Sequence, residues 1–433
     1  MSMLAEVKLW GEPVGAVSLH DGDDVASFEY LPAFAAGGIE VAPLTMPLDG
    51  AGPFRFPELA QGTFKGLPGL LADSLPDRYG NALIDTWLDR QGRTPDSFGA
   101  VERLCYIGRR GMGALEFEPA LGPNPTRNHQ IDVGALAELA AAILSERDEL
   151  RTKLGDDGAL EEILRIGSSA GGARAKALIA LHPQTGEARS GQLDVEPGFE
   201  HWLLKFDGVS DTREGDLADP RGYGLIEYAY SLTAVEAGIR MNPCRLMHEG
   251  GRSHFMTKRF DRAPGGGKVH MQSLSALAHL DFELPYHAYE QALATGRRLG
   301  LDPGDLEQLY RRMVFNVVAR NQDDHVKNIA YLMDENGHWR LSPAFDLTYA
   351  YNPQGSWTAR HQMSINGARE QITVADLRAC ARSASLRRTL VDEALGDVID
   401  AVRRWPEHAA TAGVPEPAAT RIAAAHRLDL PRA

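Results

Sequence analysis

Carboxylate and amide side chains gather in one polar stretch of the sequence, and a further carboxylate follows it. The stretch is Asn321-Gln322-Asp323-Asp324-His325-Val326-Lys327-Asn328, and the later carboxylate belongs to Ala344-Phe345-Asp346-Leu347. Transfer of a phosphoryl group needs one carboxylate that orients and deprotonates the attacking hydroxyl, together with hard oxygen ligands for Mg²⁺. A solvated acidic turn is the alternative for this stretch taken alone, because Asp and Asn are the commonest loop residues.

Further features upstream of this stretch occur in the order that a kinase requires. Asp323 and Asn328 have the Asp-x-x-x-x-Asn spacing of kinase catalytic loops, and a kinase also needs a glycine-rich turn, a strand lysine and a helix carboxylate. The sequence offers a turn at residues 168–176, then Lys205, then Glu227. Each has an ordinary alternative: a structural glycine turn, a lysine that keeps an edge strand soluble, or an exposed helix residue. Their order is what favours a nucleotide site.

The elements expected before these residues form a small β-rich domain. Short apolar runs separated by turn residues predict an antiparallel meander over residues 6–30. Ser74-Leu75-Pro76-Asp77 offers a cap and an early Pro for a helix with apolar residues at helical spacing. Residues 114–118 read as another strand, and the Gly and Pro residues that follow place a domain boundary near Pro125.

The elements expected around the lysine and the acidic stretch alternate between strands and helices. Apolar stripes predict helices at residues 136–144 and 160–166, and a period of two predicts strands at residues 177–181 and 201–206. In the second strand Trp202, Leu204 and Phe206 share one face and Lys205 lies on the other. Helical spacing returns between Glu227 and Gly238. Beyond Arg259 we expect mainly helix as far as Ala319, then a polar loop, then Arg- and Ala-rich helices.

Composition excludes several classes of protein. The chain has 433 residues with 45 Lys+Arg and 59 Asp+Glu, a net charge of −14, and only 3 cysteines. A chain of this length is expected to form two or three domains, each large enough to be stable without disulfide bonds. The negative net charge disfavours non-specific nucleic-acid binding. Cys105, Cys244 and Cys380 lie far apart and predict no disulfide framework or zinc site. No apolar run approaches the roughly 18–20 residues of a membrane span, so we expect a cytoplasmic protein without membrane contact.

The chain resembles the HipA-type serine/threonine kinases of bacterial toxin–antitoxin systems over nearly its whole length. Each shared motif is weak alone, whereas all of them in register are specific. The motifs are Leu70-Leu71-Ala72-Asp73-Ser74-Leu75-Pro76-Asp77, Gly111-Met112-Gly113-Ala114-Leu115, Ser169-Ala170-Gly171-Gly172-Ala173-Arg174-Ala175-Lys176, Arg259-Phe260-Asp261-Arg262, Asp323-Asp324-His325-Val326-Lys327-Asn328 and Phe345-Asp346.

The resemblance implies an α+β fold in three segments. Residues 1–125 would form the N-terminal β-rich domain, and residues 126–262 a kinase N-lobe that carries the phosphate-binding loop. Residues 263–433 would form a mainly helical C-lobe with the catalytic loop. This two-lobed domain is similar to both protein kinases and phosphoinositide kinases.

The resemblance also implies a role for each matching residue. Asp323 would be the catalytic base, Asn328 and Asp346 would bind Mg²⁺, and Glu227 would hold Lys205 in an ion pair. For His325, a hydrogen bond that stabilises the loop is the alternative to a place beside the γ-phosphate. The residues implied in ATP binding are Gly171, Gly172, Ala173, Arg174, Ala175, Lys176, Lys205, Lys258, Arg259, Phe260, His325, Asn328 and Asp346.

Two serines precede the implied phosphate loop. The resemblance places an inhibitory autophosphorylation site at Ser169, and the adjacent Ser168 is an alternative acceptor. A phosphate adds about −1.5 to −2 charges, so it would disfavour a loop that must itself receive the phosphates of ATP. The ordinary alternative is that both serines are small turn residues.

Two positions depart from the family pattern. Lys258 stands where relatives often have an acidic residue, which a hinge read through its backbone tolerates. Asp324 replaces a common glycine beside Asp323. An additional carboxylate there would tune or weaken metal binding.

The implied function is an ATP- and Mg²⁺-dependent protein serine/threonine kinase, the toxin of a toxin–antitoxin pair that arrests growth. By analogy with the family its substrates would be itself and a cytosolic protein of translation, such as an aminoacyl-tRNA synthetase. Its partner would be a small helix-turn-helix, HipB-like antitoxin, through which alone it reaches DNA.

Two other classes of function remain open. A lipid or small-molecule kinase would share the Asp-x-His-x-x-Asn pattern, although the sequence has no polybasic stretch for a membrane surface. A non-catalytic scaffold would hold the antitoxin on DNA, and the slightly basic region from Arg378 onward would then lie near the DNA. A solvated surface is the ordinary interpretation of that region.

Overall fold

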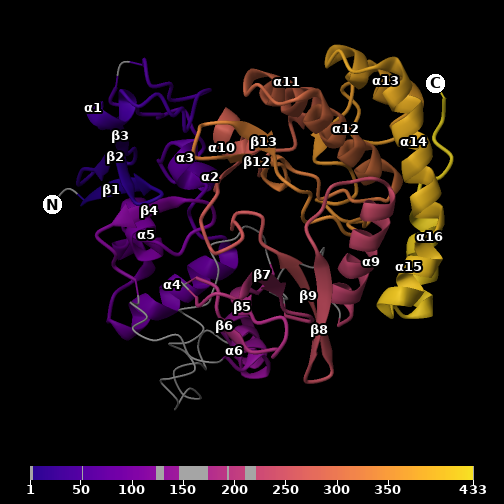
Figure 1. Ribbon diagram of the computed structural model, residues 1–433, viewed down its shortest axis with the longest axis horizontal. Coiled ribbons are helices and arrows are strands. Elements are labelled where there is room, and N and C mark those ends of the chain that lie inside the picture. The colour runs from indigo at the N-terminus through magenta and orange to yellow at the C-terminus, as the bar shows by residue number, and fades with distance from the viewer. Residues whose placement is uncertain are drawn as a thin grey trace.

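The computed structural model describes residues 3–50, 52–122, 131–145, 174–192, 195–209 and 221–432. Figure 1 shows an N-terminal domain in which helices accompany a four-stranded sheet, so it is more helical than the expected β-rich domain, then a five-stranded sheet with its helices, and a mainly helical lobe whose last helices run along one edge. The described chain confirms the α+β fold expected from the sequence. In this part of the chain no helix is both long enough and apolar enough to cross a membrane.

A four-stranded antiparallel sheet with the order β3-β2-β1-β4 forms the centre of the N-terminal domain. In β1, Ala5, Val7 and Leu9 are buried and the residues between them are not, as expected for a strand with one face on a core. The predicted meander is confirmed. The elements are β1 Met3–Leu9, β2 Glu12–Leu19, β3 Ser27–Tyr30, α1 Pro32–Ala35, α2 Gln61–Phe64, α3 Gly69–Ala72, α4 Arg78–Arg90, η1 Pro95–Ser97, α5 Ala100–Ile107 and β4 Leu115–Glu118.

The second part is a five-stranded antiparallel sheet with the order β6-β5-β7-β9-β8. Trp202, Leu204 and Phe206 face a core that also contains Tyr79 and Leu83 of α4. Helix α9 packs against the sheet at β8 and β9. The elements are α6 Val133–Ser145, β5 Lys176–Leu181, β6 Ala188–Ser190, β7 Glu200–Lys205, α9 Tyr223–Glu236, β8 Cys244–Glu249 and β9 Arg252–Lys258.

The C-lobe is built from helices around one large apolar core, with two small sheets. Helices α14 and α15 lie along α9, as Figure 1 also shows at its right edge. The elements are β10 His270–Ser273, α10 Leu274–Ala278, β11 His287–Ala288, α11 Tyr289–Arg298, α12 Pro303–Val318, η2 Val326–Asn328, β12 Ala330–Met333, β13 Trp339–Leu341, β14 Met363–Ser364, α13 Val374–Ser383, α14 Arg388–Arg403, α15 Trp405–Ala412 and α16 Glu416–Ala425.

Two expectations about the order of elements need correction. The segment after Arg259 is not mainly helical from its start, because β10 pairs with β12 before the first helix. Its buried side chains include His270 and Gln272, so apolar periodicity does not reveal this strand. Strands β8 and β9 were also not expected. The helix predicted at residues 160–166 lies outside the described residues.

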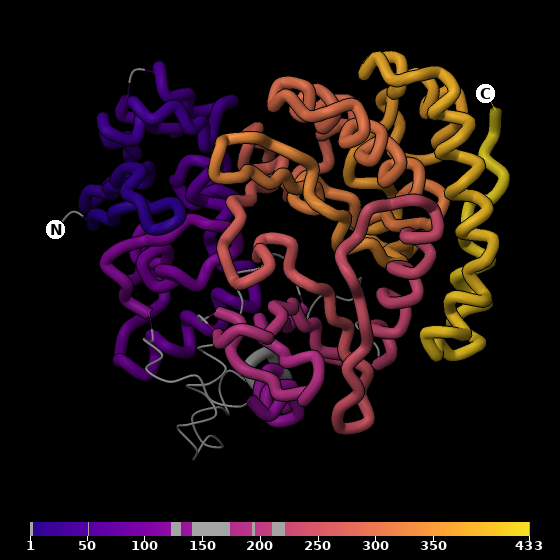
Figure 2. Tube along the Cα trace, in the orientation of Figure 1, coloured from indigo at the N-terminus to yellow at the C-terminus, as the bar shows by residue number. Residues whose placement is uncertain are grey.

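The N-terminal domain and the C-lobe share an interface. Met333 of β12 belongs to the apolar core of the N-terminal domain, and helix α3 packs against α10. The Asp73 carboxylate accepts hydrogen bonds from the backbone N–H and the hydroxyl of Ser273, each at 2.7 Å. Figure 2 shows these segments, distant in sequence, side by side. The first domain is therefore packed into the rest of the molecule.

Candidate active site

The polar stretch after α12 is held by hydrogen bonds to two other segments. Asn321 is buried, and its Nδ2 donates to Oδ1 of Asn316 in α12 at 3.0 Å. The backbone N–H of Gln322 donates to the carbonyl of Ala350 at 3.0 Å. A loop held in this way presents its side chains at fixed positions.

Asp323 is largely buried in this loop, with 33% of its side chain exposed. The indole N–H of Trp357 donates to Asp323 Oδ1 at 2.6 Å, and Nε2 of His325 lies 3.7 Å from the same oxygen. Burial by the surrounding protein raises the pKa of Asp323 above its usual value, while His325 and the Trp357 hydrogen bond oppose this shift. A carboxylate with a raised pKa is a better proton acceptor.

Asn328 and Asp346 present oxygen atoms near this carboxylate. Asn328 Nδ2 donates to the backbone carbonyl of Asp323 at 2.8 Å. Since a carbonyl only accepts, the amide nitrogen must face it, and the amide oxygen of Asn328 faces the other way. Asp346 has a φ of +56°, and its carbonyl accepts from Asn321 Nδ2 at 3.4 Å. Asp tolerates this left-handed conformation better than most residues.

Lys205 stands between two carboxylates. Its Nζ lies 2.5 Å from Glu227 Oε1 and also forms an ion pair with Asp346 Oδ1. Burial alone would lower the pKa of Lys205, but Asp346 and Glu227 outweigh it and raise that pKa. Burial would raise the pKa of Asp346, but Lys205 and then Lys176 hold it below its usual value. Lys205 is therefore charged and Asp346 ionised near neutral pH.

The close packing of α9 brings Glu227 to Lys205. A side chain at Gly224 would place its Cβ 2.2 Å from the carbonyl oxygen of Ser253 in β9, so only glycine allows this approach. Glu227 is buried, and Arg174 NH1 lies 3.4 Å from its second oxygen. The Arg174 guanidinium also stacks over the Tyr223 ring, 3.5 Å from its centroid.

Lys176 is placed differently from the expectation. Instead of ending a loop, Lys176 begins strand β5, and its side chain is 2% exposed. Its Nζ lies 3.0 Å from Oδ2 of Asp77, which belongs to the N-terminal domain. In the antiparallel pair of β5 and β7, Lys176 is directly opposite Lys205.

The residues expected at the hinge lie at the end of β9, where Lys258 is the last residue of the strand and Arg259 and Phe260 follow it. Lys258 Nζ pairs with Glu200 at 2.8 Å, and Arg259 makes a two-pronged ion pair with buried Asp261 at 2.8 and 2.6 Å. The backbone N–H groups of Lys258 and Arg259 are bonded to the carbonyls of other segments. The Phe260 ring lies 5.6 Å from the Phe345 ring, measured between centroids.

Asp324 is held by the protein itself and anchors the loop, while its charge contributes to the raised pKa of Asp323. Its carboxylate is fully buried and accepts hydrogen bonds from the Tyr289 hydroxyl at 2.9 Å, from Nδ1 of His361 at 2.8 Å and from the backbone N–H of Gln362 at 2.7 Å. The bond from Tyr289 ties the loop to α11, and the bonds from His361 and Gln362 tie it to segment 357–362, which carries the Trp357 that contacts Asp323. Both oxygens of Asp324 are occupied.

Part of the expected phosphate loop is outside the described residues. Ser168, Ser169, Gly171, Gly172 and Ala173 fall there, while Ala175 is described and buried.

The donor set fits Mg²⁺. Asn328 offers an amide oxygen and Asp346 an ionised carboxylate, and Mg²⁺ is usually held by one or two carboxylates with phosphate oxygens and water. Within the part of the chain that the structure describes, no three His, Cys, Asp or Glu side chains gather as a metal-binding group. The remaining ligands would therefore come from phosphate oxygens and water.

Sequence reasoning did not find three residues that shape the site. Trp357 contacts the candidate base, Asp77 pairs with Lys176, and Asp261 joins Arg259 and Arg262 to the backbone N–H of Gly113 in the N-terminal domain at 2.8 Å. Asp77 and Asp261 lie inside motifs shared with the family, and this position could have marked them as candidate site residues. Trp357 lies in no motif.

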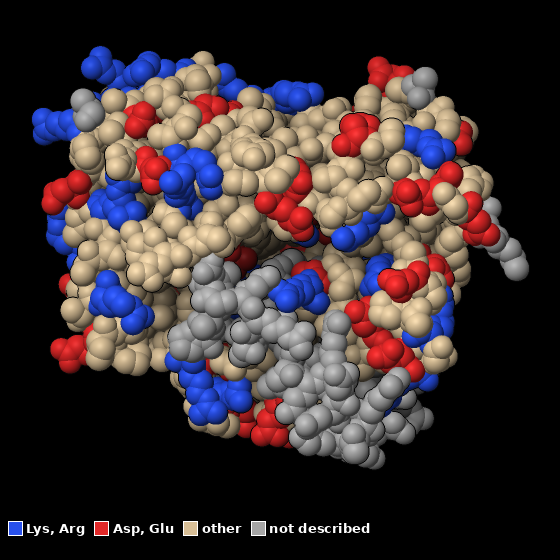
Figure 3. Space-filling view, turned by 180° about the vertical axis from the view of Figure 1, so that it is seen from behind, with Lys and Arg blue, Asp and Glu red and all other residues tan. Residues whose placement is uncertain are grey.

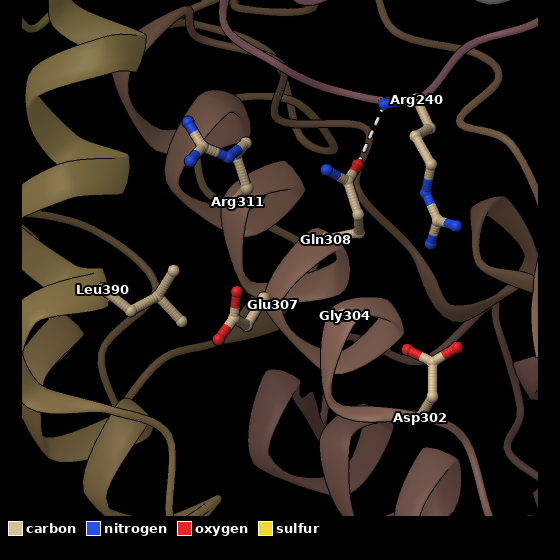
Figure 4. A pocket seen from close by; sticks show the side chains of 7 residues that line it. All are labelled: Arg240, Asp302, Gly304, Glu307, Gln308, Arg311 and Leu390. Atoms are coloured by element: carbon tan, nitrogen blue, oxygen red, sulfur yellow. Dashed lines mark hydrogen bonds between the residues drawn. The ribbon is translucent and has the colours of Figure 1, made fainter.

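Two hollows are visible on the molecule. Figure 3 shows one near the middle of the rear face, with acidic side chains at its edge. Figure 4 shows the other, beside α12 and away from the residues above. Its charged groups are paired with neighbouring residues: Arg240 with Asp305, Arg311 with Asp397, and Glu307 with Arg387. The second hollow is lined by Arg240, Asp302, Gly304, Glu307, Gln308, Arg311 and Leu390.

Family models match most of the chain. Residues 5–118 match the HipA N-terminal domain, and residues 168–405 match the HipA-like C-terminal domain. The chain belongs to the HipA family. Among solved structures, the HipA chain of a complex of HipA, HipB and operator DNA from Shewanella oneidensis MR-1 has the same fold, with a TM-score of 0.67 at 18% identity over 97% of this chain and 94% of that one.

A curated relative is similar over a shorter region. The putative kinase Y4dM of Sinorhizobium fredii is 30% identical over 152 residues, which is 34% of this chain and 36% of that relative. The match thus spans about a third of the length of the relative. In this HipA-family chain, the residues expected at the site come from the sheet with α9, from the loop after α12 and from the segment after β13, where Asp346 forms the ion pair with Lys205.

Proposed function

We propose that this HipA-family chain is an ATP- and Mg²⁺-dependent protein serine/threonine kinase. The observation that carries the proposal is the position of Lys205, whose ammonium pairs with both Glu227 and Asp346. A lysine held by a helix carboxylate and placed against a metal-binding aspartate is the arrangement that binds and orients ATP phosphates in kinases.

Each residue would act through chemistry that its surroundings favour. Asp323 would accept the proton of the attacking hydroxyl, since burial raises its pKa toward working pH. Lys205 would exchange its contact with Asp346 for the ATP phosphates while it keeps Glu227. Asp346 and Asn328 would hold Mg²⁺, which when bound would neutralise charge on the phosphates. His325, whose Nε2 lies 3.7 Å from Asp323 Oδ1, would lie beside the γ-phosphate.

Adenine would be bound at the connection between the sheet and the C-lobe. The backbone N–H groups of Lys258 and Arg259 are already bonded, and the Arg259 side chain is paired with Asp261. The backbone of Phe260 and the Phe260 ring are therefore what this segment would offer to the base.

The partner and the targets follow from the family. The solved relative forms a complex with HipB and operator DNA, and we propose a HipB-like helix-turn-helix antitoxin for this chain, with DNA reached through it. The basic side chains along the upper left edge in Figure 3 support a position near DNA despite the net charge of −14. We propose a cytosolic protein as substrate and Ser169 or Ser168 as the site of autophosphorylation.

The test is transfer of label from γ-labelled ATP with Mg²⁺, with and without cell extract. Wild type is compared with Asp323→Asn and with Asp397→Asn, an exposed aspartate paired with Arg311 on the far side of the C-lobe. Loss of the base should reduce transfer roughly 10²–10⁴-fold, whereas the control should remain active. Mass spectrometry locates the modified residue.

Each outcome separates the classes of function. Label in an extract protein and on Ser168 or Ser169 supports the proposal. Label in lipid would make the chain a lipid kinase. Transfer that does not depend on Asp323 would refute the proposed mechanism, and a complete lack of transfer would leave a scaffold.

A further inference from the structure

One carboxylate of the N-terminal domain reaches the candidate nucleotide site. Asp77 precedes α4, and its Oδ1 accepts from the backbone N–H of Gly80 at 2.7 Å, which caps the helix. Its Oδ2 lies 3.0 Å from Lys176 Nζ, and only 5% of the Asp77 side chain is exposed. Tyr79 and Leu83 of the same helix belong to the core of the five-stranded sheet, so Asp77 is fixed relative to β5.

Lys176 is a neighbour of the metal-binding carboxylate. It is directly opposite Lys205 in the pairing of β5 with β7, and opposite residues of an antiparallel pair lie on the same face, about 5 Å apart at Cβ. Lys205 contacts Asp346, and Lys176 also acts on the Asp346 carboxylate through its charge. Two ammonium groups therefore lie beside one candidate Mg²⁺ ligand.

The charges are balanced only when Asp77 is counted. Three cations, Lys205, Lys176 and Arg174, face three carboxylates, Glu227, Asp346 and Asp77. A buried ammonium without a carboxylate is costly. Without the charge of Asp77, the attraction between Lys176 and Asp346, on which Lys176 already acts, would become stronger.

We propose that Asp77 is a positioning residue of the nucleotide site, which holds Lys176 so that Asp346 stays available to Mg²⁺. This inference rests on the proposed function. It makes the N-terminal domain a contributor to the site, although no residue of that domain has to touch the nucleotide.

The substitution Asp77→Asn tests the inference cleanly. Asn caps helices as well as Asp does, so α4 keeps its first turn and only the charge is lost. The matched control is Asp302→Asn, since Asp302 caps α12 in the same way at the hollow of Figure 4. The double variant Asp77→Asn/Lys176→Met removes both charges of the pair.

The measurement is calorimetric affinity for the non-hydrolysable analogue AMP-PNP, with and without Mg²⁺. For wild type and Asp302→Asn we expect tighter binding with Mg²⁺. For Asp77→Asn the gain from Mg²⁺ should fall roughly tenfold, the usual size of a coupling between adjacent charges. Binding without Mg²⁺ should not weaken, and the double variant should recover most of the gain.

Other results would overturn the inference. An equal loss of affinity with and without Mg²⁺, or no recovery in the double variant, would show that Asp77 acts only through folding. If Asp77→Asn is obtained only unfolded, the double variant still tests the inference. A double variant whose affinity for AMP-PNP does not increase with Mg²⁺ would refute it. Wild-type protein that binds no nucleotide would refute the proposed function, whereas wild-type binding with an unaltered Asp77→Asn would refute this inference alone.

Discussion

Removal of the Asp324 carboxylate should destabilise the C-lobe strongly. In Asp324→Ala three buried donors lose their acceptor: the Tyr289 hydroxyl, Nδ1 of His361 and the backbone N–H of Gln362. A hydrogen bond to a charged group contributes roughly 1.5–3 kcal/mol. Bonds that share one acceptor are not additive, and removing one partner of a buried charged network costs about 3–5 kcal/mol. We therefore expect a loss of about 4 kcal/mol.

The assay is urea unfolding followed by tryptophan fluorescence, with Asp334→Ala as the matched control. Asp334 also accepts two backbone N–H groups in the C-lobe, but its side chain is 39% exposed, so its replacement should cost less than about 1 kcal/mol. Kinase activity of Asp324→Ala should fall as well, because segment 357–362 carries Trp357. Equal midpoints for the two variants would refute the reasoning.

Three further predictions concern the base, the lysine and the hinge. Trp357→Phe removes a hydrogen bond that lowers the pKa of Asp323, so the acid limb of the kcat/KM profile should move to higher pH. Glu227→Gln should reduce kcat/KM for ATP about 10–100-fold, because Lys205 loses its holding carboxylate. Asp261→Asn leaves two buried arginines without a carboxylate and should cost about 3–5 kcal/mol on thermal unfolding. Since the pKa of Asp261 is held below its usual value, that contribution is complete above about pH 4 and lost only as pH falls further.

Each of these predictions has a result that contradicts it. An unshifted pH profile in Trp357→Phe would mean that the indole does not act on Asp323. A normal KM for ATP in Glu227→Gln would mean that the ion pair of Glu227 with Lys205 does not contribute to nucleotide binding. The control for Asp261→Asn is Asp400→Asn, because Asp400 is exposed and pairs with Arg403. An equal loss of thermal stability in both variants would refute the argument.

The sequence predicted the elements whose patterning is local. The meander of the first domain, helix α4, strand β7 with Lys205 on its polar face, and helix α9 all follow from periods of two or 3.6 residues. Strand β10 did not, because its buried residues are His270 and Gln272, whose burial depends on partners distant in the chain. A polar residue in a core carries no periodic signal.

The site shows the same division. The order of Lys205, Glu227, Asp323 and Asp346 is visible in the sequence, because these residue types follow one another in this order along the chain of a kinase. The partners of Asp324 and of Lys176 are not visible, because they are set by tertiary contacts over long sequence separations. A carboxylate expected to disturb the metal site thus serves as an anchor of the loop.

The interface between the first domain and the rest has a consequence for dissecting the protein. A fragment that starts after residue 125 would expose Met333, the face of α10 against α3, and the side of the sheet core that α4 covers. Such a fragment should precipitate when expressed alone and stay in solution when residues 1–125 are supplied as a separate chain. The protein would then behave as two complementing pieces whose association restores one enzyme.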